Sequence, residues 1–170
     1  IKHKKSAGVN PDKQSEQFLL LMQWLEEAGY EHYEISNFAK PGWRSRHNSS
    51  YWRGKKYLGI GPSAHSYSIN ERQWNISNNN SYIESINKGE IPFEKEVLTD
   101  IQQLNEYIMT SLRTIEGLKL DHVSAAAGQQ ITSAAKKYID SGLIISENNS
   151  LVLTKQGKLL ADGIAAALFF

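Results

Sequence analysis

Apolar residues near the start of the chain recur at steps of three and four. They are Phe18, Leu21, Met22, Leu25 and Ala28. This spacing gives a helix one apolar face. Asn10 followed by Pro11 is a typical helix start, and Gly29 supplies a left-handed stop. The pattern predicts a helix over about 11–28.

Two short strands are expected next, separated by a long loop. Residues 33–35 alternate between apolar and polar side chains, which is the pattern of a half-buried strand. A second apolar run, 57–60, ends at a glycine turn. Residues 38–55 between them are interpreted as loop because a Pro-Gly pair and a further glycine interrupt them. Helix, strand, loop and strand are typical of an α/β architecture, but they are too few to close a sheet.

The middle of the chain is polar. Residues 68–80 contain five asparagines and are interpreted as a connector. A short helix is expected around 82–86, and Gly89 ends it. Pro92 then marks the boundary with a second pattern of apolar positions.

The second half reads as a separate, mostly helical unit. Thr99 and Gln102 have the spacing of a capping box, and apolar residues at helical spacing follow as far as Gly117. The remaining expected elements are helices at 121–127 and 130–141, strands at 143–145 and 151–153 around the turn Asn148-Asn149, and a helix from Thr154 to about 167. Three helices, a two-stranded wing and a closing helix predict a winged-helix-like domain.

Composition narrows the chemistry of this 170-residue chain. It has 40% hydrophobic residues, enough for a core, and no apolar run approaches the roughly 20 residues that span a bilayer. It has no cysteine, which excludes disulfides, zinc–thiolate sites and iron–sulfur ligation within these residues. The absence of cysteine is also typical of cytoplasmic proteins. Because the chain begins at Ile1, we expect it to be a piece of something longer.

Charge is unevenly distributed along the chain, whose net charge is +1. Residues 1–95 carry 13 basic and 10 acidic side chains, a balance of +3, and residues 96–170 carry 6 and 8, a balance of −2. A winged helix that binds DNA brings positive charge to the phosphates. The second half is therefore a poor candidate for DNA binding, and a docking or lid role is favoured.

A basic, aromatic run is the strongest candidate site. It contains Lys40, Arg44, Arg46, Arg53, Lys55 and Lys56, interleaved with Trp43, Tyr51 and Trp52. Aromatic side chains stack on flat ligands and guanidinium groups pair with carboxylates, so a porphyrin with propionates suits the run. Single-stranded nucleic acid would suit it by base stacking. A solvated surface loop is the third interpretation.

Two further features bear on the site. His47 is the side chain in the run that could give a nitrogen to heme iron, although a lone histidine is more often an ordinary polar residue. Gly59-Ile60-Gly61-Pro62-Ser63-Ala64 is a glycine turn that lets the backbone approach a ligand closely. It lacks the spacing of a dinucleotide fingerprint.

Three segments, YEISNFA (33–39), HNSSYW (47–52) and GIGP (59–62), together resemble the oxygen-independent coproporphyrinogen III oxidase-like branch of the radical S-adenosylmethionine proteins. More narrowly, they resemble its heme chaperones. The segments 104–118 and 153–169 are similar to the C-terminal domain of the same family.

The resemblance implies roles for named residues. His47 would be the heme-iron ligand, and Asn48, Tyr51 and Trp52 would shape the pocket beside Arg44 and Arg46. Gly59, Gly61, Pro62, Ser63 and Ala64 would lie on the S-adenosylmethionine side of the barrel, although many family members have a third glycine at position 63.

The resemblance also implies the fold, which we expect to be α+β. Residues 1–67 would be the terminal segment of a partial (β/α) barrel, 68–95 a polar connector with a short helix, and 96–170 the winged-helix-like domain. The family holds S-adenosylmethionine on a 4Fe-4S cluster bound by a CxxxCxxC loop. Since this chain has no cysteine, it is expected to perform no radical chemistry on its own.

Three functions remain open from the sequence. The first is a heme chaperone that binds heme and delivers it to a recipient hemoprotein, which the HNSSYW segment favours. The second is an oxidase that decarboxylates coproporphyrinogen III. The third is a winged-helix nucleic-acid-binding module, which the charge disfavours. A homodimer would be allowed if a strand edge of the truncated barrel stays unpaired.

Overall fold

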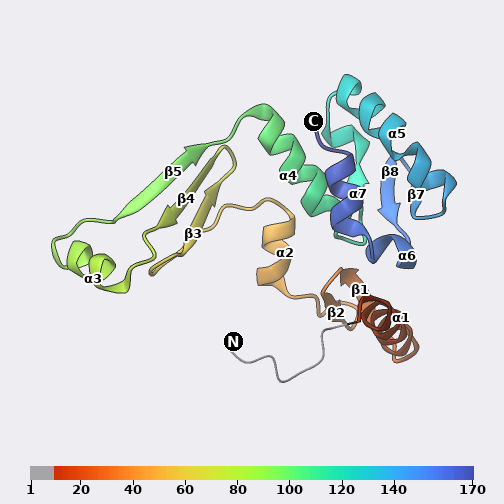
Figure 1. Cartoon of the computed structure of the whole chain (residues 1–170), viewed down its shortest axis with the longest axis horizontal. Helices are drawn as coiled ribbons and strands as arrows, with labels where there is room; N and C mark the ends of the chain where they lie inside the picture. Colours follow the sequence, from red (N-terminus) through yellow and green to blue (C-terminus); the bar gives the residue numbers. More distant parts are fainter. Residues whose placement is uncertain (1–9) are drawn as a thin grey trace.

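The structure is a computed structural model that describes residues 10–170. Residues 1–9 of the expected first segment lie outside the described residues. The described residues form both helices and antiparallel sheets, so a mixed helix and strand fold is confirmed. In Figure 1 a sheet with one helix extends as an arm to the left, and the C-terminal helices pack together on the right.

The first part joins one helix to a hairpin. Its elements are α1 (Pro11–Glu27), β1 (Glu31–Glu34), β2 (Asn37–Ala39) and α2 (Arg46–Trp52). The helix expected at 11–28 is confirmed, with the Asn10 side chain accepting from the backbone of Asp12 at 2.9 Å. The loop expected over 38–55 is wrong in part, because it contains the end of β2 and all of α2. A seven-residue helix with mixed polarity gives no periodic signal.

The arm corrects two further expectations. It consists of the antiparallel sheet β3 (His65–Ser68), β4 (Glu71–Asn75) and β5 (Phe93–Val97), with α3 (Asn79–Asn87) between the last two strands. Residues 68–80 are therefore largely hairpin, while the expected short helix is confirmed. The strand expected at 57–60 is wrong, since only Tyr57 forms a bridge, to Tyr67, and Leu58 and Ile60 are 75% and 84% exposed. The arm strands are rich in charged and hydroxyl side chains, so they show no apolar alternation.

The C-terminal part packs helices on a three-stranded sheet of order β6-β8-β7. Its elements are α4 (Asp100–Leu112), β6 (Leu118–Lys119), the 3-10 turn η1 (Leu120–His122), α5 (Ala125–Asp140), β7 (Ile144–Glu147), β8 (Ser150–Leu153), α6 (Lys155–Lys158) and α7 (Ala161–Ala167). The capping box at Thr99 is confirmed. The turn at Asn148-Asn149 is also confirmed, and both asparagines have a positive φ. The two helices expected at 121–127 and 130–141 are wrong as a pair, since Gly128 lies inside the single helix α5. The last expected helix is divided between α6 and α7.

The main hydrophobic core lies in the C-terminal part. Its most buried members are Ile108, Leu112, Leu118, Ile131, Ile144, Leu151, Ile164 and Leu168. In the first part the buried apolar residues are Met22, Tyr33 and Ala39. Most of the hydrophobic stabilisation therefore comes from residues after 100. The first part is attached to them by Ile35, which packs against the core, and by polar contacts. Within residues 10–170, no helix combines the length and hydropathy needed to cross a bilayer.

One such contact joins β1 to α6 through His32 and Lys158. The His32 ring stacks on Phe38 with centroids 4.1 Å apart, and its Nε2–H donates to the Ile35 carbonyl at 2.9 Å. Lys158 Nζ lies 3.1 Å from Nδ1 and donates to it, so His32 is held neutral. Burial lowers the pKa of His32 and the Lys158 ammonium lowers it further, against the Ile35 hydrogen bond and the Glu34 charge. Burial also lowers the pKa of Lys158, which faces Lys155, Glu26 and Glu34.

This pair predicts a loss of stability in mild acid. Because the folded pKa of His32 is lowered, the unfolded chain takes up the proton first as pH falls below the ordinary value of about 6.5. We expect the free energy of unfolding to fall between about pH 8 and about pH 5.5, and His32→Gln to reduce that fall. Urea unfolding at the two pH values measures it. Equal losses in the wild type and in His32→Gln would contradict the prediction.

Candidate functional site

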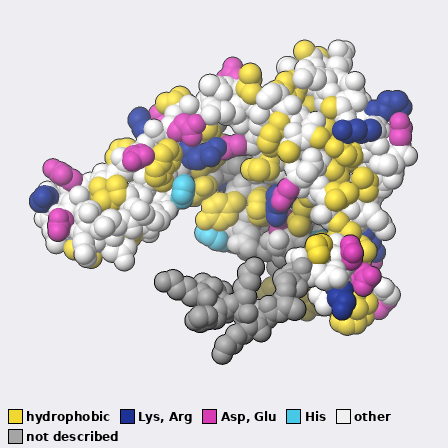
Figure 2. Space-filling view, in the orientation of Figure 1, with side chains coloured by type: hydrophobic (Ala, Val, Ile, Leu, Met, Phe, Trp, Pro, Cys, Tyr) yellow, Lys and Arg dark blue, Asp and Glu magenta, His cyan; other side chains and the backbone are white. Residues whose placement is uncertain are grey.

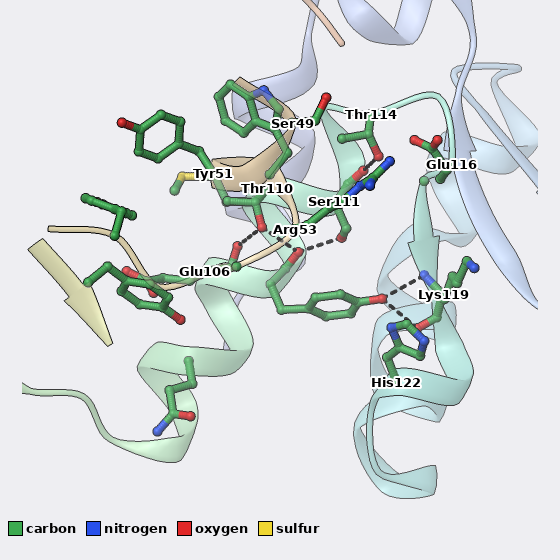
Figure 3. Close-up of a pocket in the computed structure, with 18 of the residues that line it drawn as sticks. Ser49, Tyr51, Arg53, Glu106, Thr110, Ser111, Thr114, Glu116, Lys119 and His122 are labelled. Atoms are coloured by element: carbon green, nitrogen blue, oxygen red, sulfur yellow. Dashed lines mark hydrogen bonds between the residues drawn. The ribbon is translucent and has the colours of Figure 1, made fainter. Parts of the chain in front are cut away.

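A cavity of about 770 Å³ lies where the first part, the arm and the C-terminal part meet (Figure 3). Its walls come from α2, from the segment around β3 and β4, from α4, and from β6 with η1. In Figure 2 histidine and apolar side chains border the hollow between the arm and the rest of the molecule. Pockets of this size hold small-molecule and cofactor ligands.

Aromatic rings form one wall of the cavity. Tyr51 at the end of α2 packs edge-on against Tyr57 with centroids 4.8 Å apart, and Tyr57 stacks on Tyr67 of β3 at 6.0 Å. From the C-terminal part, Tyr107 lies 5.8 Å from His122. The Tyr107 hydroxyl bonds the backbone of Lys119, and burial raises the pKa of this phenol. The wall therefore suits a flat, largely apolar ligand.

Two arginines of the cavity are already paired. Arg44 donates to Glu31 at 3.0 Å and to Glu116 at 2.6 Å, which clamps the hairpin to the segment after α4. Burial opposes the charge of Arg44, but these two carboxylates outweigh it and raise its pKa. Arg72 of β4 pairs with Glu106 of α4. Arg44 therefore lines the predicted site, but its guanidinium group is already bound to Glu31 and Glu116 on two different segments.

His47 lies beside the cavity on α2. Its Nε2 is 3.2 Å from the hydroxyl of Tyr51, one turn later on the same helix, and the two rings pack edge-on at 5.1 Å. Tyr51 lines the cavity, whereas His47 is exposed and does not line it, so His47 adjoins the cavity wall through Tyr51. The Ser45 side chain starts α2 by accepting from the Asn48 backbone at 3.1 Å, which fixes the helix that carries His47.

Asn48 and Trp52 face the protein rather than solvent. Asn48 Nδ2 donates to Asn37 Oδ1 at 3.0 Å, and the Asn37 amide donates to Glu34. Buried Glu34 also accepts from Arg113 Nε at 3.0 Å, and the Arg113 guanidinium lies 5.2 Å from the Trp52 ring centroid. These contacts attach α2 to the end of α4. Both motif residues therefore position the histidine-bearing helix.

Trp52 also carries an unsatisfied polar atom. It lines the cavity, and its buried Nε1 has no hydrogen-bond partner among the residues that the structure describes. A buried N–H without an acceptor is costly.

The glycine turn lies outside the cavity lining. Asn75 at the end of β4 donates to the Gly61 carbonyl at 2.9 Å, so the turn is anchored on the arm. A Cβ at Gly59 would lie 2.2 Å from the His65 carbonyl oxygen, and Gly61 has a φ of 106°. Both glycines are required by the turn itself. Neither they nor Pro62, Ser63 and Ala64 line the cavity.

The structure divides the residues that the sequence singled out. Arg44, Tyr51 and Trp52 line the cavity. Arg46, His47 and Asn48 belong to α2 but do not line the cavity. Arg53 of the basic run also lines the cavity, but the sequence interpretation missed the other lining groups, which include Tyr57, Tyr67, Tyr107, Lys119 and His122. They are scattered over 70 positions and share no motif. Within residues 10–170 no cluster of three or more histidine, aspartate or glutamate side chains could hold a metal ion.

Comparison with known proteins identifies the second half. The family model described as the HemN C-terminal domain matches residues 98–160, from the end of β5 to the start of α7. This part of the chain therefore resembles a HemN C-terminal domain. The heme chaperone HemW of Bacillus subtilis is 32% identical over 162 residues, which are 92% of this chain and 42% of that protein. HemW of Mycobacterium tuberculosis H37Rv is also 32% identical, over 95% of this chain and 41% of its own length.

The remaining comparisons agree. A mitochondrial radical S-adenosyl methionine domain-containing protein 1 of Danio rerio is 31% identical over 82% of this chain and 35% of its own. The solved structure of coproporphyrinogen III oxidase (HemN) from Escherichia coli, a radical SAM enzyme, matches with a TM-score of 0.72 at 16% identity, over 95% of this chain and 42% of that one. The chain thus spans about two fifths of the length of these relatives. The resemblance to HemN-like radical SAM proteins and their heme chaperones is confirmed, and so is the mixed helix and strand fold.

Proposed function

We propose that the chain is the C-terminal part of a heme chaperone, a radical SAM-type protein that binds heme and passes it to a recipient hemoprotein. The single observation that carries the proposal is the position of the histidine of HNSSYW, which is exposed on a short helix and contacts Tyr51, a residue that lines the aromatic cavity. The names of the HemW relatives support it. A cytoplasmic location, expected from the absence of cysteine, belongs to the same proposal.

His47 is proposed as the ligand of the heme iron. Its Nε2 bonds only the Tyr51 hydroxyl among the described residues, and an exposed phenol can rotate away. The nitrogen would then be free to take up iron, which imidazole binds strongly. Asn48 and Trp52 would hold α2 in place through Asn37 and Arg113 while the ligand enters beside Tyr51.

Residues 1–67 are proposed to be the last segment of the family's partial barrel, 68–95 a connecting arm, and 96–170 a winged-helix-like lid or docking domain. In the full-length parent Gly59, Gly61, Pro62, Ser63 and Ala64 would face S-adenosylmethionine, which a 4Fe-4S cluster would hold. The similarity to the HemN structure, at 16% identity, supports a shared fold and gives no support to the decarboxylating oxidase. The HNSSYW segment favours the chaperone.

The chain by itself is expected to be inert toward S-adenosylmethionine. It has no cysteine to bind a 4Fe-4S cluster. Incubation with iron, sulfide, dithionite and S-adenosylmethionine should release no 5′-deoxyadenosine or methionine. Release of either product above a protein-free control would contradict the proposal.

Heme titration of the wild type and of His47→Ala tests iron ligation. We expect the Soret band of the wild type to shift and saturate near one heme per chain, and the variant to lose this shift with at least about tenfold weaker binding. Iron-free protoporphyrin IX is the matched control, since removing an iron ligand should leave its binding unchanged. An identical Soret shift in His47→Ala would remove His47 as the ligand.

A further inference from the structure

The cavity lining carries a net positive charge that internal ion pairs do not cancel. It contains four cationic side chains, Arg44, Arg53, Arg72 and Lys119, and two carboxylates, Glu106 and Glu116, a balance of +2. Arg44 and Arg72 are bound to Glu116 and Glu106. Arg53 and Lys119 form no ion pair with any residue from 10 to 170. These two side chains are the charge that remains for a ligand.

The two cations come from different parts of the chain. Arg53 directly follows α2 and is its C-cap residue, and Lys119 ends β6 within the HemN C-terminal domain. Figure 3 shows Arg53 and Lys119 on separate segments around the same cavity. A ligand with two anionic groups would therefore be held by both parts of the chain at once.

The rest of the lining restricts what lies between the two charges. The Tyr51, Tyr57 and Tyr67 rings pack on one another and supply an aromatic wall. Nucleic acid would need a longer row of phosphate-binding cations than two. A rigid aromatic macrocycle with two carboxylates matches the wall, the volume and the charge together.

We propose that this cavity is a tetrapyrrole dicarboxylate site in which Arg53 and Lys119 pair with the two carboxylates. The inference rests on the proposed heme-handling function and adds the groups that hold the ligand's carboxylates. The macrocycle lies against the tyrosine wall, with its centre toward Tyr51 and the adjacent His47. The HemN C-terminal domain then closes the site by supplying Lys119 and Tyr107.

The test compares heme with its dimethyl ester, whose carboxylates carry no charge. Dissociation constants are measured from Soret absorbance for the wild type, Arg53→Ala and Lys119→Ala, with Lys136→Ala on the surface of α5 as the matched loss of a cation. Each cavity variant is expected to bind heme about tenfold more weakly, as removal of a charge-assisted hydrogen bond does, and the ester with unchanged affinity. Lys136→Ala should match the wild type for both ligands. Circular dichroism verifies that each variant is folded.

Iron-free protoporphyrin IX, followed by fluorescence, separates this inference from iron ligation. In one outcome, Arg53→Ala and Lys119→Ala weaken the binding of protoporphyrin IX, while His47→Ala changes the affinity for neither heme nor protoporphyrin IX. The carboxylate site then stands, and His47 is not the iron ligand. If His47→Ala abolishes the Soret shift while the two cavity variants bind heme within twofold of the wild type, the iron ligand stands and this inference is overturned. Equal weakening of heme and ester binding, or no binding of any tetrapyrrole, would also overturn it.

Discussion

Replacing Arg113 with alanine is expected to lower the free energy of unfolding by about 3–5 kcal/mol, because it leaves the carboxylate of Glu34 buried without a cation. The Glu34 side chain has no exposed surface, and Arg113 Nε donates to it at 3.0 Å. Without Arg113 the carboxylate keeps only the Ser36 backbone N–H and the Asn37 amide. These neutral donors do not replace a full positive charge in a buried position.

The measurement is urea unfolding near neutral pH, with two comparisons built into the chain. Lys155→Ala removes an exposed ion pair to Glu26 between α6 and α1, and should cost far less, because solvent screens that pair. Glu34→Gln combined with Arg113→Ala removes the stranded charge and should recover part of the loss. If Arg113→Ala cost no more than Lys155→Ala, the buried pair would have no special role.

The same substitution should also loosen α2. Arg113 lies over the Trp52 ring, and Glu34 reaches Asn48 through Asn37. The helix that carries His47 would lose the contacts that attach it to α4. We therefore expect Arg113→Ala to bind heme more weakly under conditions where the chain is still folded. The wavelength of the His47-dependent Soret band should be unchanged, because the iron ligand is still present.

Gly117→Ala is expected to destabilise the chain by about 2–5 kcal/mol, because two separate costs add. Gly117 has a φ of 68°, which L side chains adopt with strain. An added Cβ would also lie 2.4 Å from the Leu151 carbonyl oxygen and 2.8 Å from Val152 Cγ2. Since β6 pairs with β8 one residue later, the clash would push the two strands apart.

Gly142→Ala is the matched control for this effect. Its φ of 72° is nearly the same, but an added Cβ would meet nothing within 4 Å. It should therefore show only the backbone strain, about 1–2 kcal/mol. Thermal or urea unfolding of the two variants isolates the close approach at Gly117. Equal losses would mean that β8 can move away without cost.

Periodic burial and local capping could be predicted from the sequence. The helix that begins at Pro11, the capping box at Thr99 and the hairpin turn at Asn148-Asn149 depend on residues within a few positions of one another. The segments YEISNFA, HNSSYW and GIGP together likewise indicated the family. Where the pattern was not local the prediction was wrong, as for the polar strands of the arm and for Gly128 inside α5. Polar strands are fixed by their hydrogen-bond partners, which alternation does not reveal.

The sequence by itself therefore determined the helices that begin at Pro11 and after Thr99, the resemblance to heme chaperones and the residue proposed to bind iron. Only the tertiary structure decided which side chains surround a ligand. Arg53 and Lys119 are 66 positions apart, and Trp52 meets Arg113 across a similar separation. Such pairs arise when distant segments are packed together, and no spacing along the chain encodes them. A buried carboxylate such as Glu34 is stable only because folding brings its cation to it.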